Sequence, residues 1–132
     1  MLFSFFNYRK AINQTMLYHP GTHLIASLQS KNIAALSTGS NFKLLVDSLI
    51  QIYELQKLGE VYHDFSPAGF TAVVCLSESH ISMHTWPEYG KINLDIYLSN
   101  HERENDGTVQ QMYQSFVSFF EATVLDVQIL KR

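Results

Sequence analysis

The strongest constraint on the fold is a series of short strand-like segments with only short breaks between them. They occupy residues 60–65, 69–76, 80–85 and 91–98. The breaks are Pro-Ala-Gly, Ser-Glu-Ser and Trp-Pro-Glu-Tyr-Gly, which are residue types typical of turns. Several of these segments are therefore expected to pair as antiparallel hairpins.

Two helices and two further strands are predicted around this series. Ser40 and Asn41 are expected to cap a first helix, which Gly59 is expected to end. A second helix is predicted to start near Asp106, and strands are predicted at 22–28 and 123–131. The apolar residues at helical spacing are Phe42, Leu45, Leu49, Ile52 and Tyr53 in the first helix and Val109, Met112, Tyr113, Phe116, Val117 and Phe120 in the second. This order predicts an α+β fold, a two-layer sandwich in which two helices cover one face of an antiparallel sheet.

The size and composition of the chain fit one domain. Of the 132 residues, 46% are apolar, enough for an ordinary core. We predict an N-terminal extension over residues 1–20 and a domain over 21–132. The single cysteine, Cys75, cannot form an internal disulfide, and its apolar surroundings in the sequence predict a buried side chain.

Charge and hydropathy exclude two classes of partner. The net charge of −3 comes without a basic stripe, so nucleic-acid binding has no electrostatic support. The aromatic residues at 1–8 precede Arg9 and Lys10, whereas a signal peptide has its positive charges first, and no segment reaches the ~20 apolar residues of a membrane span. A cytoplasmic protein without a membrane partner is expected.

Alternation along two of the strands gathers polar side chains on one face of each. His80, Ser82 and His84 share one face of the strand at 80–85. The strand at 91–98 and the residue after it have a similar face, formed by Asn93, Asp95, Tyr97 and Ser99. If the two strands are neighbours, both polar faces meet at one site.

Three explanations of the polar segment 77–90 follow from the residues alone. His80 and His84 are possible zinc ligands, but no Cys or third His supports them at a suitable spacing, so no metal is predicted. Ser79 and a histidine could form a hydrolase pair, although the chain has no Gly-x-Ser-x-Gly elbow. A purely structural hairpin with hydrogen-bonded histidines is the third explanation.

A longer match favours a fourth explanation. The string Glu-Ser-His-Ile-Ser-Met-His-Thr-Trp-Pro-Glu-Tyr-Gly at 78–90 closely resembles the self-cleavage signature of prokaryotic S-adenosylmethionine decarboxylase proenzymes. The stretch His-Asp-Phe-Ser-Pro-Ala-Gly-Phe-Thr at 63–71 and the sequence Gly-Thr-His at 21–23 are also similar to that family. The resemblance covers about residues 21–99.

The resemblance implies a chain that cuts itself between Glu78 and Ser79. The Ser79 hydroxyl would attack the Glu78 carbonyl, and β-elimination would then convert Ser79 into a pyruvoyl group, the only cofactor implied. That group condenses with a substrate amine and withdraws electrons as CO2 leaves. Thr71 and His84 match the family residues that assist processing.

The resemblance also implies how a small-molecule substrate is bound. Phe65 matches an aromatic residue that stacks on adenine, and a phenylalanine in the core is the alternative. Glu88 matches a glutamate that accepts hydrogen bonds from ribose hydroxyls. A homodimer with active sites near the subunit contact is the implied assembly.

One position departs from the family pattern. Ser99 stands twenty residues after Ser79, where the family has a cysteine that returns a proton to the substrate carbon. A hydroxyl is far less acidic than a thiol, so Tyr97, His101 or His80 are alternative donors. The departure makes decarboxylation of arginine or ornithine an alternative function. A second alternative, of a different class, is an unprocessed relative that binds a ligand or partner without catalysis.

Overall fold

The computed structural model describes residues 17–132. Residues 1–16, most of the predicted N-terminal extension, lie outside the described residues. The described elements are β1 (Thr22–Gln29), α2 (Ile33–Ser37), α3 (Ser40–Ile52), β2 (Lys57–Asp64), β3 (Phe70–Leu76), β4 (Ser79–Trp86), the 3-10 turn η1 (Pro87–Tyr89), β5 (Lys91–Leu98), α4 (Asp106–Phe119) and β6 (Thr123–Lys131).

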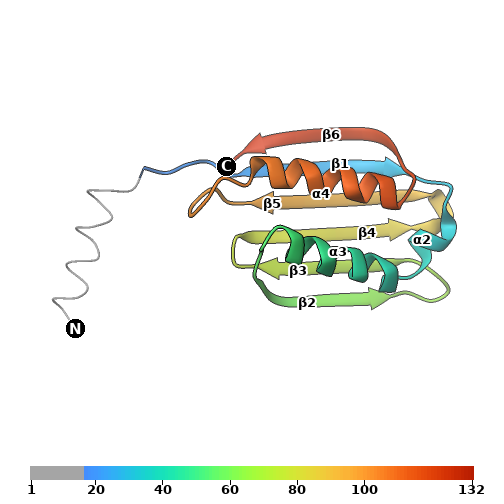
Figure 1. Ribbon diagram of the computed structural model, residues 1–132. Helices are drawn as coiled ribbons and strands as arrows, with labels where there is room; N and C mark the ends of the chain where they lie inside the picture. Colours follow the sequence, from blue (N-terminus) through green and yellow to red (C-terminus); the bar gives the residue numbers. More distant parts are fainter. Residues whose placement is uncertain (1–16) are drawn as a thin grey trace.

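The six strands form one antiparallel sheet in the order β2-β3-β4-β5-β1-β6 (Figure 1). The predicted hairpins are confirmed, because β2, β3, β4 and β5 are sequential neighbours. Strand β1 pairs with β5 on one side and with β6 on the other, so the two ends of the domain meet. Gly21 and Arg132 exchange two backbone hydrogen bonds at this point.

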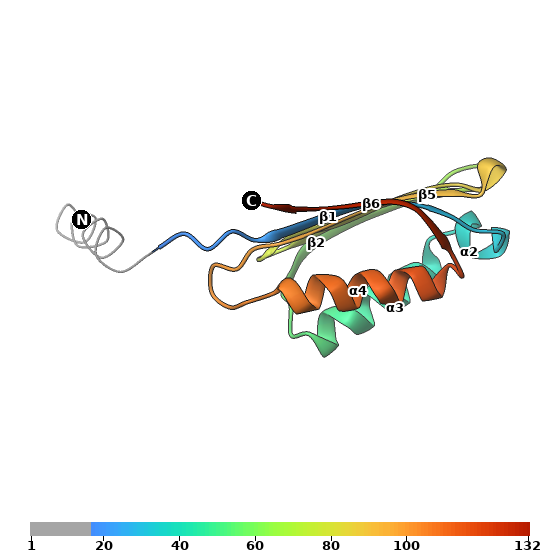
Figure 2. The same cartoon turned by 90° about the horizontal axis from the view of Figure 1, so that it is seen from above.

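Both long helices lie on the same face of the sheet, and Figure 2 shows the other face without a helix among the described residues. The core lies between these two layers, as predicted. Buried side chains alternate along the central strands, whose other side chains point to the open face. The helix residues that bury in the core are Phe42, Val46, Leu49 and Ile50 of α3 and Val109, Met112, Tyr113 and Phe116 of α4.

The boundaries of the first long helix correct the sequence prediction. Gly39 is its N-cap, and Ser40 is already its first helical residue. The helix stops at Ile52, and Glu54 then takes a left-handed φ of 53°. Gly59 lies inside β2, which begins at Lys57. The short helix α2 was not predicted, because one turn carries too little periodicity to detect.

The prediction of a buried Cys75 is wrong. Its side chain is exposed on the open face of β3. The apolar neighbours Val74 and Leu76 are buried because they point toward the helices, whereas alternation turns Cys75 the other way.

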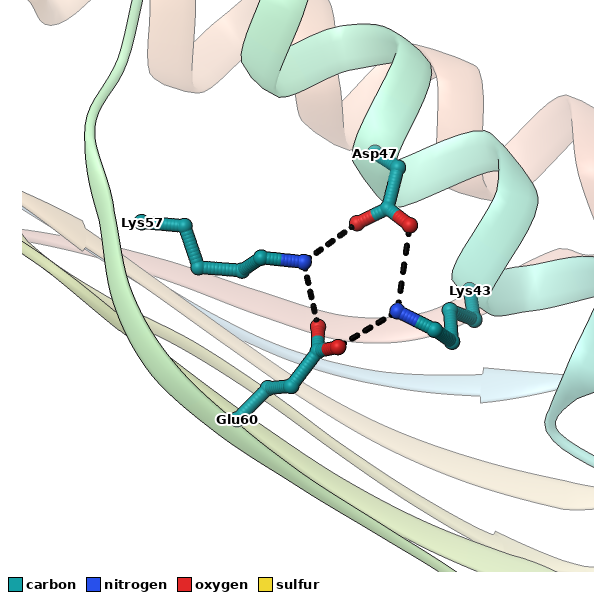
Figure 3. Close-up of polar contacts among 4 residues, drawn as sticks. All are labelled: Lys43, Asp47, Lys57 and Glu60. Atoms are coloured by element: carbon teal, nitrogen blue, oxygen red, sulfur yellow. Dashed lines mark hydrogen bonds and ion pairs between the residues drawn. The ribbon is translucent and has the colours of Figure 1, made fainter.

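An ion-pair ring of Lys43, Asp47, Lys57 and Glu60 holds α3 against the edge strand β2 (Figure 3). Lys57 Nζ lies 2.9 Å from Asp47 Oδ1 and 2.8 Å from Glu60 Oε2. The hydrogen bonds that Lys57 donates to Glu60 and Asp47 raise the pKa of Lys57 above its ordinary value. Hydrogen bonds from Lys43 and Lys57 lower that of Glu60. The four charges alternate in sign around the ring, so each group contacts two groups of opposite charge.

Within residues 17–132, no helix is long and apolar enough to cross a membrane.

Candidate active site

The junction between Glu78 and Ser79 lies at the exit of a two-residue turn that joins β3 to β4. Leu76 and Ser79 face each other as the last pair of this hairpin. Ser79 has a φ of 139°, a conformation that side-chain-bearing residues rarely adopt. Such a conformation costs on the order of 1–3 kcal/mol. The backbone is therefore strained at the bond that the sequence resemblance singles out.

The carbonyl group of Glu78 is held by the residue after β5. Ser99 donates its backbone N–H to the Glu78 oxygen at 2.8 Å. An N–H in this position can stabilise negative charge that develops on the oxygen when a nucleophile attacks the carbonyl carbon. The pairing of Ser79 with Leu98 brings Ser99 to this point. The structure thus places Ser99 beside the junction.

The side chain of Glu78 is also held in place by hydrogen bonds, and it is only 14% exposed. Arg103 Nη2 lies 3.0 Å from Glu78 Oε1, and Arg103 Nε lies 3.2 Å from Oε2. Asn105, itself buried, donates to the same carboxylate and to the Ser99 carbonyl. Sequence reasoning missed Arg103 and Asn105, because their loop has no motif and their contact with the junction is made only by folding.

Four other predicted site residues gather at the opposite end of the hairpin. Phe65, Thr71, His84 and Glu88 line one pocket of about 400 Å³, together with Trp86. Thr71 and His84 are paired across β3 and β4, and their side chains are hydrogen-bonded through Thr71 Oγ1 and His84 Nδ1. A volume of this size is sufficient for a small-molecule ligand.

Phe65 and Glu88 both have side chains available to such a ligand. Phe65 is 50% exposed, so the alternative of a core phenylalanine is wrong. The ring of His63 packs edge-on against that of Phe65, with centroids 4.7 Å apart. Glu88 lies in the exposed turn η1. The pocket therefore offers an aromatic face and a carboxylate.

The two groups of residues do not meet within one chain. Ser79 begins β4, and His84 lies five residues further along the same strand. A rise of about 3.3 Å per residue separates their Cα atoms by about 16 Å. The chain thus contains two separate groups of candidate residues. We call them the junction half-site, formed by Glu78, Ser79 and Ser99, and the pocket half-site, formed by Phe65, Thr71, His84 and Glu88.

Between the half-sites, the polar faces of β4 and β5 do meet, as expected from alternation. Ser82 faces Asp95 in the register, and His80 Nε2 lies 3.0 Å from Asp95 Oδ2. His23 of β1 binds the other oxygen of the same carboxylate. Sequence reasoning paired His80 with His84 and missed His23, which is far away in the chain.

His23, His80 and Asp95 have ligand atoms within 4.8 Å of one another, a grouping compatible with a metal ion. A further contact favours a hydrogen-bond network instead. Arg132 Nη1 lies 3.2 Å from His23 Nδ1, and arginine can only donate. His23 Nδ1 is then the acceptor and Nε2 carries the hydrogen, which points to Asp95. In metal sites the second nitrogen of a histidine ligand usually donates to its partner.

Comparison with known proteins gives a consistent result. Residues 22–132 match the family model described as S-adenosylmethionine decarboxylase. An S-adenosylmethionine decarboxylase proenzyme of Archaeoglobus fulgidus is 35% identical over 101 residues, which are 76% of this chain and 87% of the relative. One from Picrophilus torridus is 34% identical over 103 residues, 75% of this chain and 79% of the relative.

A solved structure is similar over nearly the same region. The crystal structure of the adenosylmethionine decarboxylase from Aquifex aeolicus aligns with a TM-score of 0.76 at 26% sequence identity. The alignment covers 88% of this chain and 92% of the other. Sequence and fold therefore point to the same family.

Proposed function

The chain belongs to the S-adenosylmethionine decarboxylase family, and from this premise we propose that it is a proenzyme that cuts itself between Glu78 and Ser79 and then decarboxylates S-adenosylmethionine. The reaction supplies aminopropyl groups for polyamine synthesis. The names of the relatives favour S-adenosylmethionine over arginine or ornithine as substrate. They also favour a catalytic proenzyme over an unprocessed binding protein.

The observation that carries the proposal is the geometry of the junction. The Ser79 hydroxyl attacks the Glu78 carbonyl carbon, so that an ester replaces the amide and the hydroxyl proton passes to the amine. The left-handed φ of Ser79 strains the starting amide, and the Ser99 N–H is placed to stabilise charge on the carbonyl oxygen. Both features lower the barrier of this step.

The residues of the junction also fit the prosthetic group that the family implies. Elimination would break the bond between Cβ and Oγ of Ser79, so that the oxygen leaves with the Glu78 carboxylate and a dehydroalanine remains. The imine form of that residue would take up water and lose ammonia, which gives a pyruvoyl group at the new chain end. This group supplies an electron-withdrawing ketone for decarboxylation, and no separately bound cofactor is needed. The hydrogen-bonded pair of Thr71 and His84 holds and moves protons during processing.

The pocket half-site is proposed to bind the substrate. The exposed ring of Phe65 offers a flat apolar surface on which adenine can stack. The carboxylate of Glu88 can accept two hydrogen bonds from ribose hydroxyls. A sulfonium is also attracted to aromatic faces such as that of Trp86, which lines the same pocket.

The distance between the half-sites supports a homodimer as the working unit. A twofold axis that reverses the direction of β4 brings the junction half-site of one protomer to the pocket half-site of its partner. The open face of the sheet is the side on which His84 projects, and it also exposes apolar residues such as Ile25 and Val73. Two protomers packed through their open faces would cover these residues and complete two sites.

Intact-mass measurement of freshly made protein tests the cleavage. The full chain is expected to convert into fragments 1–78 and 79–132, and the second should carry a pyruvoyl group at its start. Ser79→Ala should abolish the conversion and keep the fold, because one small side chain replaces another. A wild-type chain that stays whole after long incubation contradicts the proposal.

A mixed-subunit experiment tests whether one site is built from two chains. Neither Ser79→Ala nor His84→Ala is expected to cleave alone. In a co-produced mixture, the His84→Ala chain should cleave, because the Ser79→Ala chain lends it an intact Thr71–His84 pair. If the His84→Ala chain stays uncut in the mixture, His84 has to act within its own chain, and the two-protomer site has no support.

A further inference from the structure

We propose that Arg103 is a positioning residue for self-cleavage, acting through the side chain of Glu78. This inference rests on the proposed function and adds a residue from the loop between β5 and α4. The loop has no role in the motifs that identify the junction. Its contacts connect Arg103 to the carbonyl group that Ser79 attacks.

The guanidinium group of Arg103 is also anchored to the end of α3. Its Nη2 donates to the backbone oxygens of Tyr53 and Glu54, each at 3.0 Å. These carbonyl groups lie at the carboxyl end of α3, where the helix dipole favours a cation. Arg103 therefore presents a charge at a place fixed by the helix.

The carboxylate of Glu78 needs this partner. Because only 14% of the side chain is exposed, water solvates its charge poorly. Arg103 supplies two contacts to the two carboxylate oxygens, an arrangement that fixes orientation as well as charge. Asn105 adds one hydrogen bond to the same group.

The contacts of the Glu78 side chain are connected to the scissile carbonyl group by two further hydrogen bonds. Asn105 Nδ2 donates both to Glu78 and, at 2.8 Å, to the Ser99 carbonyl. The Ser99 N–H then donates to the Glu78 carbonyl oxygen at 2.8 Å. The side chain and the main chain of Glu78 are thus held by one connected set of bonds, which fixes where the Ser99 N–H points.

Charge gives a second reason for the role. When the bond from Ser79 Oγ to the Glu78 carbonyl carbon forms, negative charge develops on the carbonyl oxygen. It is lost again when the C–N bond breaks and the amine takes up the hydroxyl proton. An uncompensated carboxylate in the same residue opposes that charge, and the guanidinium group of Arg103 cancels the effect. Arg103 therefore acts on the barrier to attack as well as on the geometry.

The test is the rate at which purified full-length chain converts to the two fragments, measured by intact mass. Arg103→Ala is expected to slow conversion by about 10- to 100-fold, the size of a positioning defect. The double variant Arg103→Ala/Glu78→Gln should convert about tenfold faster than Arg103→Ala alone, because the second substitution removes the uncompensated charge. Glu102→Ala, an exposed change in the same loop, is the matched control and should cleave at the wild-type rate.

The outcomes separate the proposals. Conversion of Arg103→Ala at the wild-type rate overturns the role of Arg103 and leaves the proposed function intact. Slow conversion without rescue by Glu78→Gln also overturns it, because a purely structural loop defect predicts that result. A wild-type chain that never cleaves overturns both. If thermal unfolding shows Arg103→Ala to be unfolded, Arg103→Gln, which keeps a polar side chain with an N–H donor and loses the charge, takes its place in the same comparison.

Discussion

The carboxylate of Asp106 joins four separate parts of the chain. It begins α4 and accepts hydrogen bonds from Thr22 of β1 at 2.5 Å, from Asn100 at 2.9 Å and from Lys131 of β6 at 2.7 Å. Hydrogen bonds from Lys131, Thr22 and Asn100 lower the pKa of Asp106 to about 2. The charged form is therefore the one that stabilises the fold.

This shift predicts how stability depends on pH. An unfolded aspartate has a pKa of about 3.9, so the stabilising effect is complete above that value and is lost as the pH falls toward 2. Asp106→Asn should lower the free energy of unfolding by about 1 kcal/mol at pH 7, a modest value because solvent screens a group that is 35% exposed. Urea unfolding at pH 2–7 should show the difference between the two proteins shrinking below pH 4. A constant difference would mean that the charge of Asp106 is not responsible.

Ser99 contributes to the junction through its backbone, whereas the family cysteine is proposed to act through its side chain. The N–H contact to Glu78 does not depend on the side chain, so self-cleavage can tolerate a serine at this position. Protonation of the substrate carbon after CO2 leaves does depend on an acidic group. A hydroxyl in that role should deliver the proton slowly or to the wrong carbon.

Ser99→Cys should therefore accelerate decarboxylation while leaving self-cleavage close to the wild-type rate. General acid catalysis is worth about 10²–10⁴ in rate, and a thiol should recover a large part of it. CO2 release from S-adenosylmethionine, arginine and ornithine measures the effect in both proteins. No gain with S-adenosylmethionine, combined with good turnover of arginine or ornithine by the wild type, would point to a different substrate and another donor, such as His80.

Local sequence predicted only part of the candidate site. Glu78, Ser79, Thr71 and His84 could be named because they lie in one continuous hairpin with a recognisable pattern. Arg103, Asn105 and His23 could not, because each reaches the site from a distant segment and through a contact that depends on the packing of the loop or of β1. The position of Ser99 beside the junction likewise depends on the register of β4 with β5.

At the scale of elements, the ion-pair ring described above contributes to the packing of α3 on the edge strand β2, together with the contact between the rings of Phe42 and Tyr62. Among residues 17–132, strand β2 pairs only with β3, so its contacts with the helix are a second attachment. The side chains of the ring are 23–38% exposed, so salt weakens but does not abolish their attraction. Lys57 bridges Asp47 of the helix and Glu60 of the strand.

Lys57→Ala should lower the free energy of unfolding by about 0.5–1 kcal/mol, the upper range for ion pairs at a surface. The loss should shrink in 1 M salt, where charges are screened over about 3 Å. Lys31→Ala is the control, because Lys31 is exposed and forms no ion pair among residues 17–132. Equal effects of the two substitutions on denaturant midpoints would show that the ring contributes nothing specific.

The strands and helices with a strong periodic pattern were predicted well. The features that depend on tertiary contacts, such as the end of α3 and the exposure of Cys75, were not. The alternation in β4 and β5 fixed their buried and open faces, and the stripe in α4 fixed its orientation. The end of α3 was misplaced because Glu54, a residue without turn propensity, adopts the left-handed conformation that usually marks glycine. Cys75 was misplaced because its apolar run was treated as buried on both sides, whereas the helices cover one face.

At the scale of the whole molecule, the order of the strands in the sheet determines what a cut at Ser79 does to the protein. The fragment 1–78 contains β1, β2 and β3, and the fragment 79–132 contains β4, β5 and β6. In the sheet order β2-β3-β4-β5-β1-β6, β1 of the first fragment lies between β5 and β6 of the second. The two fragments are therefore interleaved.

We expect the cut protein to keep its fold and its two fragments to stay together. They should elute as one species in native size-exclusion chromatography and separate only in denaturant. The physical reason is that three seams, β3–β4, β5–β1 and β1–β6, hold them by backbone hydrogen bonds and a shared core. Spontaneous separation in native buffer would contradict this arrangement.

The interleaving also changes how the protein can refold once it has been cut. Before the cut, the hairpin turn at 77–78 is a covalent tether, and every strand can refold from one continuous chain. Afterwards, a denatured molecule has to find its other half by collision, at a concentration far below the effective concentration that the tether provided. The new chain end also cannot regenerate the bond that was lost. Folding should therefore precede maturation, with the sheet formed while the chain is whole. The cut protein then keeps a fold that its two separated fragments would regain only slowly.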